Sequence, residues 1–388
     1  MGLGAIFIAL MPIQDFVLQT TPLGFLAASL SFIVIPFMIF NRLRSRKIHK
    51  GERVYFIIVF LLTLYSFVIG LMEILYRPST FEFSSGLKLL ILFIFSTYPL
   101  AFYWDTEIKN LKKGLSTSLI ILIFGVILVD IFKADMVGLF HLSEVQDKRL
   151  RGFSSESSIF GMTVATITLC WLGQLKNVRE LPALVSLILI LWICGSKGAI
   201  FAFFAALFFH YLSQIKINMR YMVAIILLFT VGSFSIYQAI LDLAADIENY
   251  NSFSTRATFI VSSLNLIMDY PFGVGFFGYY SIGKAAVSDV LLGYSLNIKE
   301  VETIILTGTN YGFKSGAAEL LVIGGIPLLT VFLYFFYKLY KRSENMMLRL
   351  ALLFSLFSFM TYVSFIGFYA MLLPIIVSRQ KVIGCGKY

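Results

Sequence analysis

Charged residues are scarce in this chain. Only 13% of its 388 residues are Asp, Glu, Lys or Arg, whereas a soluble globular domain carries about 25%. Hydrophobic residues make up 59% of the chain, and the mean hydropathy is +0.88. Too little polar material remains to cover a water-facing surface. The composition therefore excludes a soluble domain and predicts an all-α integral membrane protein.

Cysteine and histidine are also sparse, with three of each. The cysteines show no CxxC spacing, and the histidines are scattered over three regions: Cys170, Cys194, Cys385, His49, His141 and His210. Such a set supports neither a disulfide framework nor a metal site. A P-loop is absent as well, and the short basic loops leave no room for a nucleotide-binding domain. We expect no metal, no cofactor and no use of ATP.

Long apolar runs dominate the sequence. A membrane helix needs about 20 predominantly apolar residues. Such runs occur at residues 3–18, 22–41, 54–74, 86–104, 114–132, 158–174, 181–196, 198–213, 221–241, 316–338 and 350–377. The last run is too long for one upright span and could bend at Gly367. We therefore expect a polytopic protein with about 11 to 12 transmembrane helices.

The net charge of +10 would suggest a nucleic-acid partner in a soluble protein, but in a membrane protein basic loops mark the cytoplasmic side. Alternate connections hold 17 basic and five acidic residues: 42–53, 105–113, 175–180, 213–220 and 338–349. The others hold ten basic and 13 acidic residues: 73–85, 133–157, around 197, and 242–315. The first set is predicted to be cytoplasmic, and no nucleic-acid partner is expected.

Two long connections, 133–157 and 242–315, then face outward from a single membrane domain spanning residues 1–388. Loops of this length are usually functional or disordered. Within the second, residues 255–270 predict an amphipathic helix, with one apolar face formed by Phe259, Ile260, Leu264, Ile267 and Met268. Such a helix would lie on or dip into the membrane surface.

The segment from Gly273 to Gly278 matches the GxGxxG pattern. A dinucleotide site needs these glycines between a strand and a helix of a βαβ unit. Here they follow Pro271 in an outer loop of a helical protein. They are better explained as a turn that allows close approach of backbones.

Charges at the outer rim of a membrane protein are functional candidates because they are costly to desolvate. Six stand out: Arg151, Glu156, Lys197, Arg256, Lys314 and Glu319. Solvated loop residues, a snorkelling lysine or a simple surface arginine are the alternatives. Asp130 and Lys88, near outer helix ends, favour structural roles. Outward-facing cations around one cavity suit an anionic ligand, since arginine binds phosphate through a planar fork of donors.

The stretch "STRATFIVSSLNLIMDYPFGVGFFGYY" resembles a motif of the O-antigen polymerase and ligase superfamily, in which an arginine begins a helix that ends in a proline and a GxG turn. Three further stretches resemble landmarks of that family in the same order: "RGFSSESSIFG", "CGSKGAIF" and "AELLVIGGIPLL". Ligase-like members carry a histidine followed by an asparagine where this chain has Lys314 and Ser315. The resemblance therefore favours a Wzy-type polymerase over a ligase.

This resemblance implies a metal-independent glycosyltransferase of the bacterial inner membrane, with its active face in the periplasm. It would join undecaprenyl-pyrophosphate-linked oligosaccharide repeat units, in contact with membrane lipid and with a chain-length regulator as a further partner. Arg151 and Arg256, supported by Lys197 and Lys314, would stabilise the pyrophosphate. Glu156 or Glu319 would be the base.

Two other functions stay open. A ligase would move finished glycan from the carrier lipid to lipid A core. A flippase or other transporter would carry the lipid-linked oligosaccharide across the membrane, but transporters commonly show two similar halves with charges at the bilayer midplane. In this chain the polar residues gather at one face, and no repeat relates the halves.

Overall fold

The structure is a computed structural model, and it describes fourteen ranges of the chain. These are residues 2–13, 29–45, 48–76, 82–102, 108–133, 150–154, 157–175, 180–213, 252–293, 299–307, 312–313, 315–343, 345–361 and 373–377. Throughout these ranges the regular structure is helical, with no strand. The predicted all-α class is confirmed.

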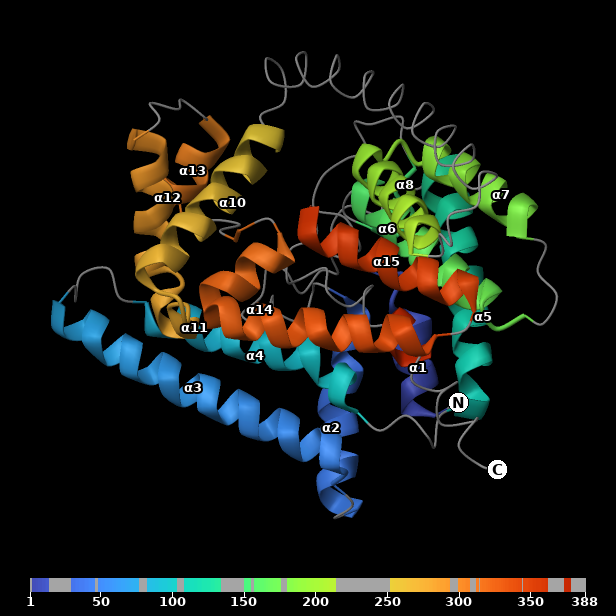
Figure 1. The fold of residues 1–388 in the computed structure, drawn as a ribbon. Helices are drawn as coiled ribbons and strands as arrows, with labels where there is room; N and C mark the ends of the chain where they lie inside the picture. Colours follow the sequence, from blue (N-terminus) through green and yellow to red (C-terminus); the bar gives the residue numbers. More distant parts are fainter. Residues whose placement is uncertain are drawn as a thin grey trace.

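The helices are labelled in chain order in Figure 1. Their bounds are α1 Leu3–Leu10, η3 Leu30–Ile33, α2 Val34–Ser45, α3 Lys50–Tyr76, α4 Phe83–Ala101, α5 Ile108–Gly125, η6 Val126–Ile131, α6 Ser157–Leu172, α7 Glu180–Ile193, α8 Lys197–Leu212, α10 Ser252–Asp269, α11 Gly275–Gly278, α12 Ser281–Gly293, α13 Lys299–Thr307, α14 Gly316–Arg342 and α15 Met346–Thr361.

Four stretches of the described chain are helical, long and apolar enough to cross a membrane: Lys50–Tyr76, Phe83–Ala101, Asn110–Ile131 and Gly316–Arg342. Shorter apolar helices occur at Ser157–Leu172, Glu180–Ile193, Lys197–Leu212 and Met346–Thr361. Apolar side chains such as Phe60, Leu64 and Leu71 are exposed on α3, as expected of a helix surface that faces lipid. The chain is a polytopic membrane protein. The predicted span 221–241 lies outside the described residues, so the number of spans stays a prediction.

Two predicted boundaries are wrong. The first helix ends at Leu10 in a turn at Met11 and Pro12, because proline has no amide hydrogen with which to continue the helical hydrogen bonds. The second α-helix begins at Val34 after a short 3₁₀ turn and continues to Ser45. Of the last predicted run, α15 covers Met346–Thr361 and a further helical stretch covers 373–377, while the expected bend at Gly367 lies outside the described residues.

The helices form two groups joined by long elements (Figure 1). At one end α10 packs against α12, α13 and α14, beside the short α11. At the other end α6, α7 and α8 pack together. The connection between the groups is made by α14 and α15, since α15 contacts α14 as well as α6 and α8.

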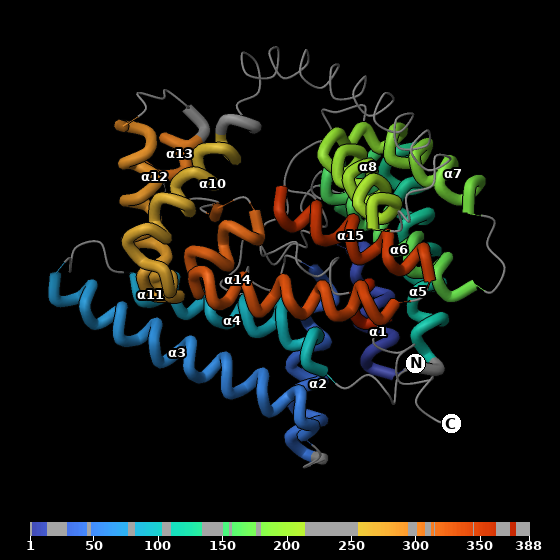
Figure 2. Tube along the Cα trace, in the orientation of Figure 1, coloured from blue at the N-terminus to red at the C-terminus, as the bar shows by residue number. Residues whose placement is uncertain are grey.

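The backbone of α14 is broken at Gly325, which has φ 64° and ψ −160° and precedes Pro327 by two residues. In an unbroken helix the amide of Ile326 would donate to the carbonyl of Val322. Here the Ile326 amide donates to the Pro271 carbonyl at 3.0 Å, and the Val322 carbonyl accepts from the Val274 amide at 2.7 Å. The turn after α10 thus supplies hydrogen-bond partners for both the Ile326 amide and the Val322 carbonyl. Figure 2 follows the trace of α14 through this break.

The same turn is held on its other side by α3. The Tyr65 hydroxyl donates to the Gly273 carbonyl at 2.7 Å, and the Ser66 hydroxyl accepts from the Phe276 amide at 3.0 Å. Gly273 and Gly275 have φ of +77° and +69°, a region that favours glycine. A Cβ atom at Gly273 would lie 2.7 Å from the backbone of α14. The predicted role of these glycines, a turn that brings backbones close, is confirmed.

Replacing Gly275 by alanine should destabilise the protein by about 2 kcal/mol or more, because φ is positive and the new Cβ would meet Ser66. That Cβ would lie 2.5 Å from the Ser66 hydroxyl oxygen. The measurement is the unfolding midpoint in detergent. Gly293→Ala is the matched control, since its Cβ would meet nothing within 4 Å. Equal midpoints for the two variants would contradict the role of the turn.

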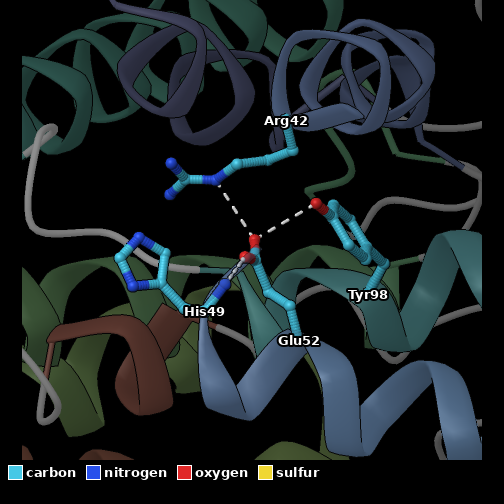
Figure 3. Close-up of polar contacts among 4 residues, drawn as sticks. All are labelled: Arg42, His49, Glu52 and Tyr98. Atoms are coloured by element: carbon cyan, nitrogen blue, oxygen red, sulfur yellow. Dashed lines mark hydrogen bonds and ion pairs between the residues drawn. The ribbon is translucent and has the colours of Figure 1, made fainter. Parts of the chain in front are cut away.

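A buried ion pair ties the predicted cytoplasmic ends of α2, α3 and α4 together (Figure 3). The Arg42 guanidinium lies 3.2 Å from the Glu52 carboxylate, which also accepts from the His49 amide at 3.0 Å and the Tyr98 hydroxyl at 3.4 Å. Glu52 is the third residue of α3, so its bond to His49 is one half of a capping box. The guanidinium also lies 4.8 Å from the ring centroid of Phe102.

Glu52→Gln should lower the unfolding free energy by about 3 kcal/mol, because it removes the charge that pairs with a largely buried arginine. The double change Arg42→Met with Glu52→Gln should recover part of that loss, since no unpaired cation remains. Chemical denaturation in detergent measures both. The control is Glu180→Gln, which changes an exposed carboxylate in the first turn of α7 and should leave the unfolding free energy unchanged. If Glu52→Gln also leaves it unchanged, the buried ion pair does not stabilise the fold.

Candidate functional site

Arg151 is buried just before α6 and is held in place by Asp130. The Asp130 carboxylate accepts hydrogen bonds from the backbone amides of Arg151, at 3.2 Å, and Gly152, at 2.9 Å. Asp130 lies in η6, a π-helical turn that ends the span begun by α5, and π turns frequently accompany functional sites. The structural role expected of Asp130 is thus to fix the backbone that carries Arg151.

The amino-terminal turns of α6 and α8 touch each other. Ser196 caps α8 by accepting from the Ala199 amide at 3.3 Å, and its hydroxyl donates to the Ser158 carbonyl of α6 at 3.4 Å. A side chain at Gly161 would collide with Ser196. Asp130 also interacts electrostatically with Cys194, in the turn before α8. These contacts bring the predicted residues Arg151 and Lys197 to neighbouring helix ends.

This first group of residues suits an anion. The amino terminus of a helix carries a partial positive charge and directs amides outward, and two such termini lie side by side here. Arg151 and the exposed Lys197 add full charges at the same end of both helices. Such an arrangement can stabilise negative charge on a phosphate group.

The second group centres on Glu319, which is buried in the first turn of α14. Its carboxylate accepts from the Tyr279 hydroxyl at 3.4 Å, and that hydroxyl oxygen accepts from the Phe313 amide at 3.3 Å. A Cβ at Gly312 would lie 3.2 Å from the same carboxylate oxygen. The ring of Phe313 packs edge-on against Tyr279, at 5.5 Å, and against Phe259 of α10, at 5.6 Å.

Arg256 joins this second group through α10. It lies one turn before Phe259, on the helix that packs against the helix of Glu319. The structure therefore places the predicted pair Arg256 and Glu319 on contacting helices. Carboxylates beside aromatic rings are suited to bind sugars, since the carboxylate accepts hydroxyl hydrogen bonds and the rings cover apolar sugar faces.

The residues of the predicted apolar face of α10 divide between a buried and an exposed side. Phe259 and Ile267 are buried, but Leu264 and Met268 are 52% and 85% exposed. The buried side of α10 instead carries small hydroxyl residues among its apolar ones: Thr255, Thr258, Ser262 and Ser263. Small side chains let helices approach closely, and apolar side chains facing outward are stable in lipid. The placement of this helix on the membrane surface stays a prediction.

An ion pair between Lys284 of α12 and Glu82, at 3.4 Å, borders the second group. The Lys284 ammonium lies 6.0 Å from the ring centroid of Tyr280. Burial raises the pKa of Tyr280 to about 12, and the negative charges of Glu319 and Glu82 add to the rise. A hydrogen bond from Ser85 lowers the pKa of Glu82, opposed by partial burial and assisted by Lys284. Tyr280 therefore stays protonated and able to donate a hydrogen bond.

The structure thus gathers four of the six predicted residues into two groups, Arg151 with Lys197 and Arg256 with Glu319. Glu156 and Lys314 lie outside the described residues. The two groups are linked through α15, because Ser315, the residue before α14, donates to the Phe359 and Met360 carbonyls at 3.4 and 2.9 Å, and α15 packs on α6 and α8. Figure 1 shows α10 on one side of this link and α6 and α8 on the other.

Sequence reasoning missed Tyr279 and the Lys284–Glu82 pair, whose partners lie 40 and 202 positions apart in the chain. A tyrosine doublet directly after the GxGxxG segment was the available signal for Tyr279. In the part of the chain that the structure describes, no group of three or more His, Cys, Asp or Glu residues could hold a metal ion.

No family model matches the chain. The chain is similar to a Klebsiella pneumoniae protein described as an uncharacterized 49.5 kDa protein in a cps region. The two are 29% identical over 349 residues, which is 85% of this chain and 79% of the relative. The similarity therefore extends over most of both proteins.

Asp130→Ala should accelerate amide exchange of residues 150–154 by about tenfold or more, because two backbone amides lose their acceptor and each such bond contributes about 1 kcal/mol. Hydrogen exchange followed by mass spectrometry of peptides over that segment measures the effect. Asp289→Ala, an exposed aspartate of α12, is the control. Unchanged exchange in the Asp130 variant would show that the carboxylate does not order this loop.

Proposed function

We propose that this protein is a polysaccharide polymerase of the bacterial inner membrane. It transfers a glycan from a polyprenyl-pyrophosphate carrier onto the next lipid-linked repeat unit, at the periplasmic face. The donor and acceptor are both lipid-linked oligosaccharides. Repeat units that accumulate in a polymerase-deficient host can serve as substrates in a test. A chain-length regulator is a further partner of the assembly.

The observation that carries this proposal is that one membrane fold holds two groups of residues with different chemistry, one cationic and one built from a carboxylate and aromatic rings. Arg151 and Lys197 stand at two touching helix termini, which suits a pyrophosphate. Glu319, Tyr279 and the neighbouring rings suit sugar hydroxyls, with Arg256 on the adjoining helix. A polymerase that displaces pyrophosphate with a hydroxyl needs both.

The Klebsiella pneumoniae relative supports the same general role. Its description places it in a cps region, and cps denotes capsule polysaccharide. This description supports a role for the present chain in polysaccharide biosynthesis. The resemblance of the four motifs to the O-antigen polymerase and ligase superfamily adds the reaction class.

The proposed chemistry is a displacement at the anomeric carbon of the donor glycan, through an oxocarbenium-like transition state. Negative charge grows on the leaving pyrophosphate, where Arg151, Arg256 and Lys197 stabilise it, with Lys314 as a further cation. A carboxylate must accept the proton of the attacking hydroxyl. Glu319 and Glu156 are the sequence-predicted candidates for that base.

Arg256→Ala should reduce polymerisation by about 100-fold, and Arg256→Lys should recover only part of it, because lysine keeps the charge but lacks the planar fork. The measurement is a gel of surface polysaccharide from a host that lacks its own copy of the gene. Chains longer than one repeat unit should disappear in the alanine variant. Arg53→Ala, an exposed arginine near the start of α3, is the control and should leave the chains intact.

Normal long chains in both Arg256 variants would overturn the polymerase proposal. The same gel separates a polymerase from the rival functions when the gene is deleted. A deletion strain that shows single repeat units supports a polymerase. Bare acceptor without any repeat unit would indicate a ligase or a flippase; a separate assay of the accumulated lipid-linked repeat units distinguishes them, since these units lie on the periplasmic side without a ligase and on the cytoplasmic side without a flippase.

A further inference from the structure

The second half of α14 leaves one face of the helix exposed. Between the break at Gly325 and the end of the helix at Arg342, the exposed residues include Ile326, Val331, Tyr334, Tyr337, Lys338 and Lys341. From Val331 onward they recur at spacings of three and four residues, which places them on the same side of a helix. Because α14 is long and apolar enough to cross a membrane, we expect lipid rather than water to cover most of this face.

The chemistry of this exposed face changes along the helix as the chemistry of a phospholipid does. The part nearest the break is apolar, the middle carries the two tyrosines, which are 61% and 56% exposed, and the end carries the two lysines. Apolar side chains match an acyl chain, and tyrosine prefers the membrane–water interface, where the ester groups of a lipid lie. The lysines, at the end predicted to be cytoplasmic, match the phosphate of a headgroup.

Both lysines lie against these tyrosines. The Lys338 ammonium is 5.8 Å from the ring centroid of Tyr334, and the Lys341 ammonium is 5.3 Å from that of Tyr337. Each ring belongs to the preceding turn of the helix, and side chains of a helix lean toward its amino terminus. Both ammonium groups are therefore directed back along α14, toward the apolar part of the face. A lysine that only anchors a helix end to water would extend in the opposite direction.

The charges of these two lysines are not neutralised by a described carboxylate. Within the ranges that the structure describes, Lys338 and Lys341 form no ion pair with an acidic residue. Arg342 adds a further exposed cation at the next position, and Glu344 lies outside the described residues. Cation–π contacts hold an ammonium group in place but leave its charge uncompensated. The end of the exposed face therefore favours an anion.

Neighbouring residues fix the end of α14. The Tyr340 and Ser213 hydroxyls form a hydrogen bond at 2.6 Å, which joins α14 to the end of α8. The Arg349 guanidinium of α15 donates to the Ser343 carbonyl at 2.5 Å and lies 5.7 Å from the ring centroid of Tyr340. The exposed face is thus part of a junction of three helices. A ligand bound to it would meet a preorganised surface.

We propose that this exposed face of α14 binds an anionic phospholipid. The headgroup phosphate lies between Lys338 and Lys341, and an acyl chain runs along the apolar part toward Ile326. The tyrosine hydroxyls donate hydrogen bonds to phosphate or ester oxygens. An anionic lipid is favoured over a zwitterionic one because the latter carries its own cation, which offsets the attraction of its phosphate to the lysines. The proposal does not depend on the polymerase function.

The test compares the binding of phosphatidylglycerol, which is anionic, and phosphatidylcholine, which is zwitterionic, to the purified full-length protein in detergent. Native mass spectrometry gives the two dissociation constants. The wild type should bind phosphatidylglycerol about tenfold or more tightly, since each lysine beside an anionic lipid contributes roughly fivefold. Lys338→Gln with Lys341→Gln should reduce this preference to about twofold or less. Equal affinities of the wild type for the two lipids would overturn the proposal.

The matched control is Lys112→Gln with Lys113→Gln, which removes two exposed lysines of α5 at the same predicted side of the membrane. This variant should keep the wild-type preference. An equal loss of preference in the control would show that binding follows the net charge of that side, and the assignment to α14 would be wrong.

Two further measurements complete the test. Excess inorganic phosphate should leave phosphatidylglycerol bound to the wild type, and its displacement would show that the face takes free phosphate instead of a lipid. If the lysine variant does not accumulate, Tyr334→Leu with Tyr337→Leu decides. Loss of both rings should weaken phosphatidylglycerol binding by about threefold or more, and unchanged binding would refute the proposal.

Discussion

One interrupted hydrogen bond inside α14 determines how the rest of the structure is arranged. In lipid no water replaces a lost backbone partner, so a broken membrane helix is stable only where protein groups satisfy the freed amide and carbonyl. The turn at residues 271–274 supplies both, through Pro271 to Ile326 and Val274 to Val322. Because α3 also binds this turn through Tyr65 and Ser66, three distant segments of the chain are fixed at one point.

This junction positions the second group of candidate residues. α10 enters the turn and α11 leaves it, so Arg256 upstream and Tyr279 downstream are held relative to Glu319 on the broken helix. The first group depends on a different device, the Asp130 carboxylate and the touching termini of α6 and α8. The anion-binding and hydroxyl-binding parts of the proposed site are thus built independently and meet through α15.

The sequence was informative where local chemistry decides the outcome. Low charge and long apolar runs predicted a helical membrane protein, and glycines after Pro271 predicted a close-approach turn, because both depend on residues adjacent in the chain. The buried hydroxyl residues of α10, such as Thr258 and Ser262, were not predicted, because the apolar pattern alone does not say which side packs on other helices. Contacts such as Asp130 with Arg151 and Arg42 with Glu52 could not be foreseen, since nothing in either local pattern specifies the partner helix.

The π-helical turn that carries Asp130 determines the direction in which its side chain points. A π turn holds one residue more than the α-helical turn it replaces, and each residue rotates a helix by about 100°. A chain one residue shorter at Val126–Ile131 would still end its span in an aspartate, yet that carboxylate would face away from Arg151. The length of the helix therefore determines the direction in which Asp130 points, and an aspartate at the matching position of another chain would not by itself identify an equivalent site.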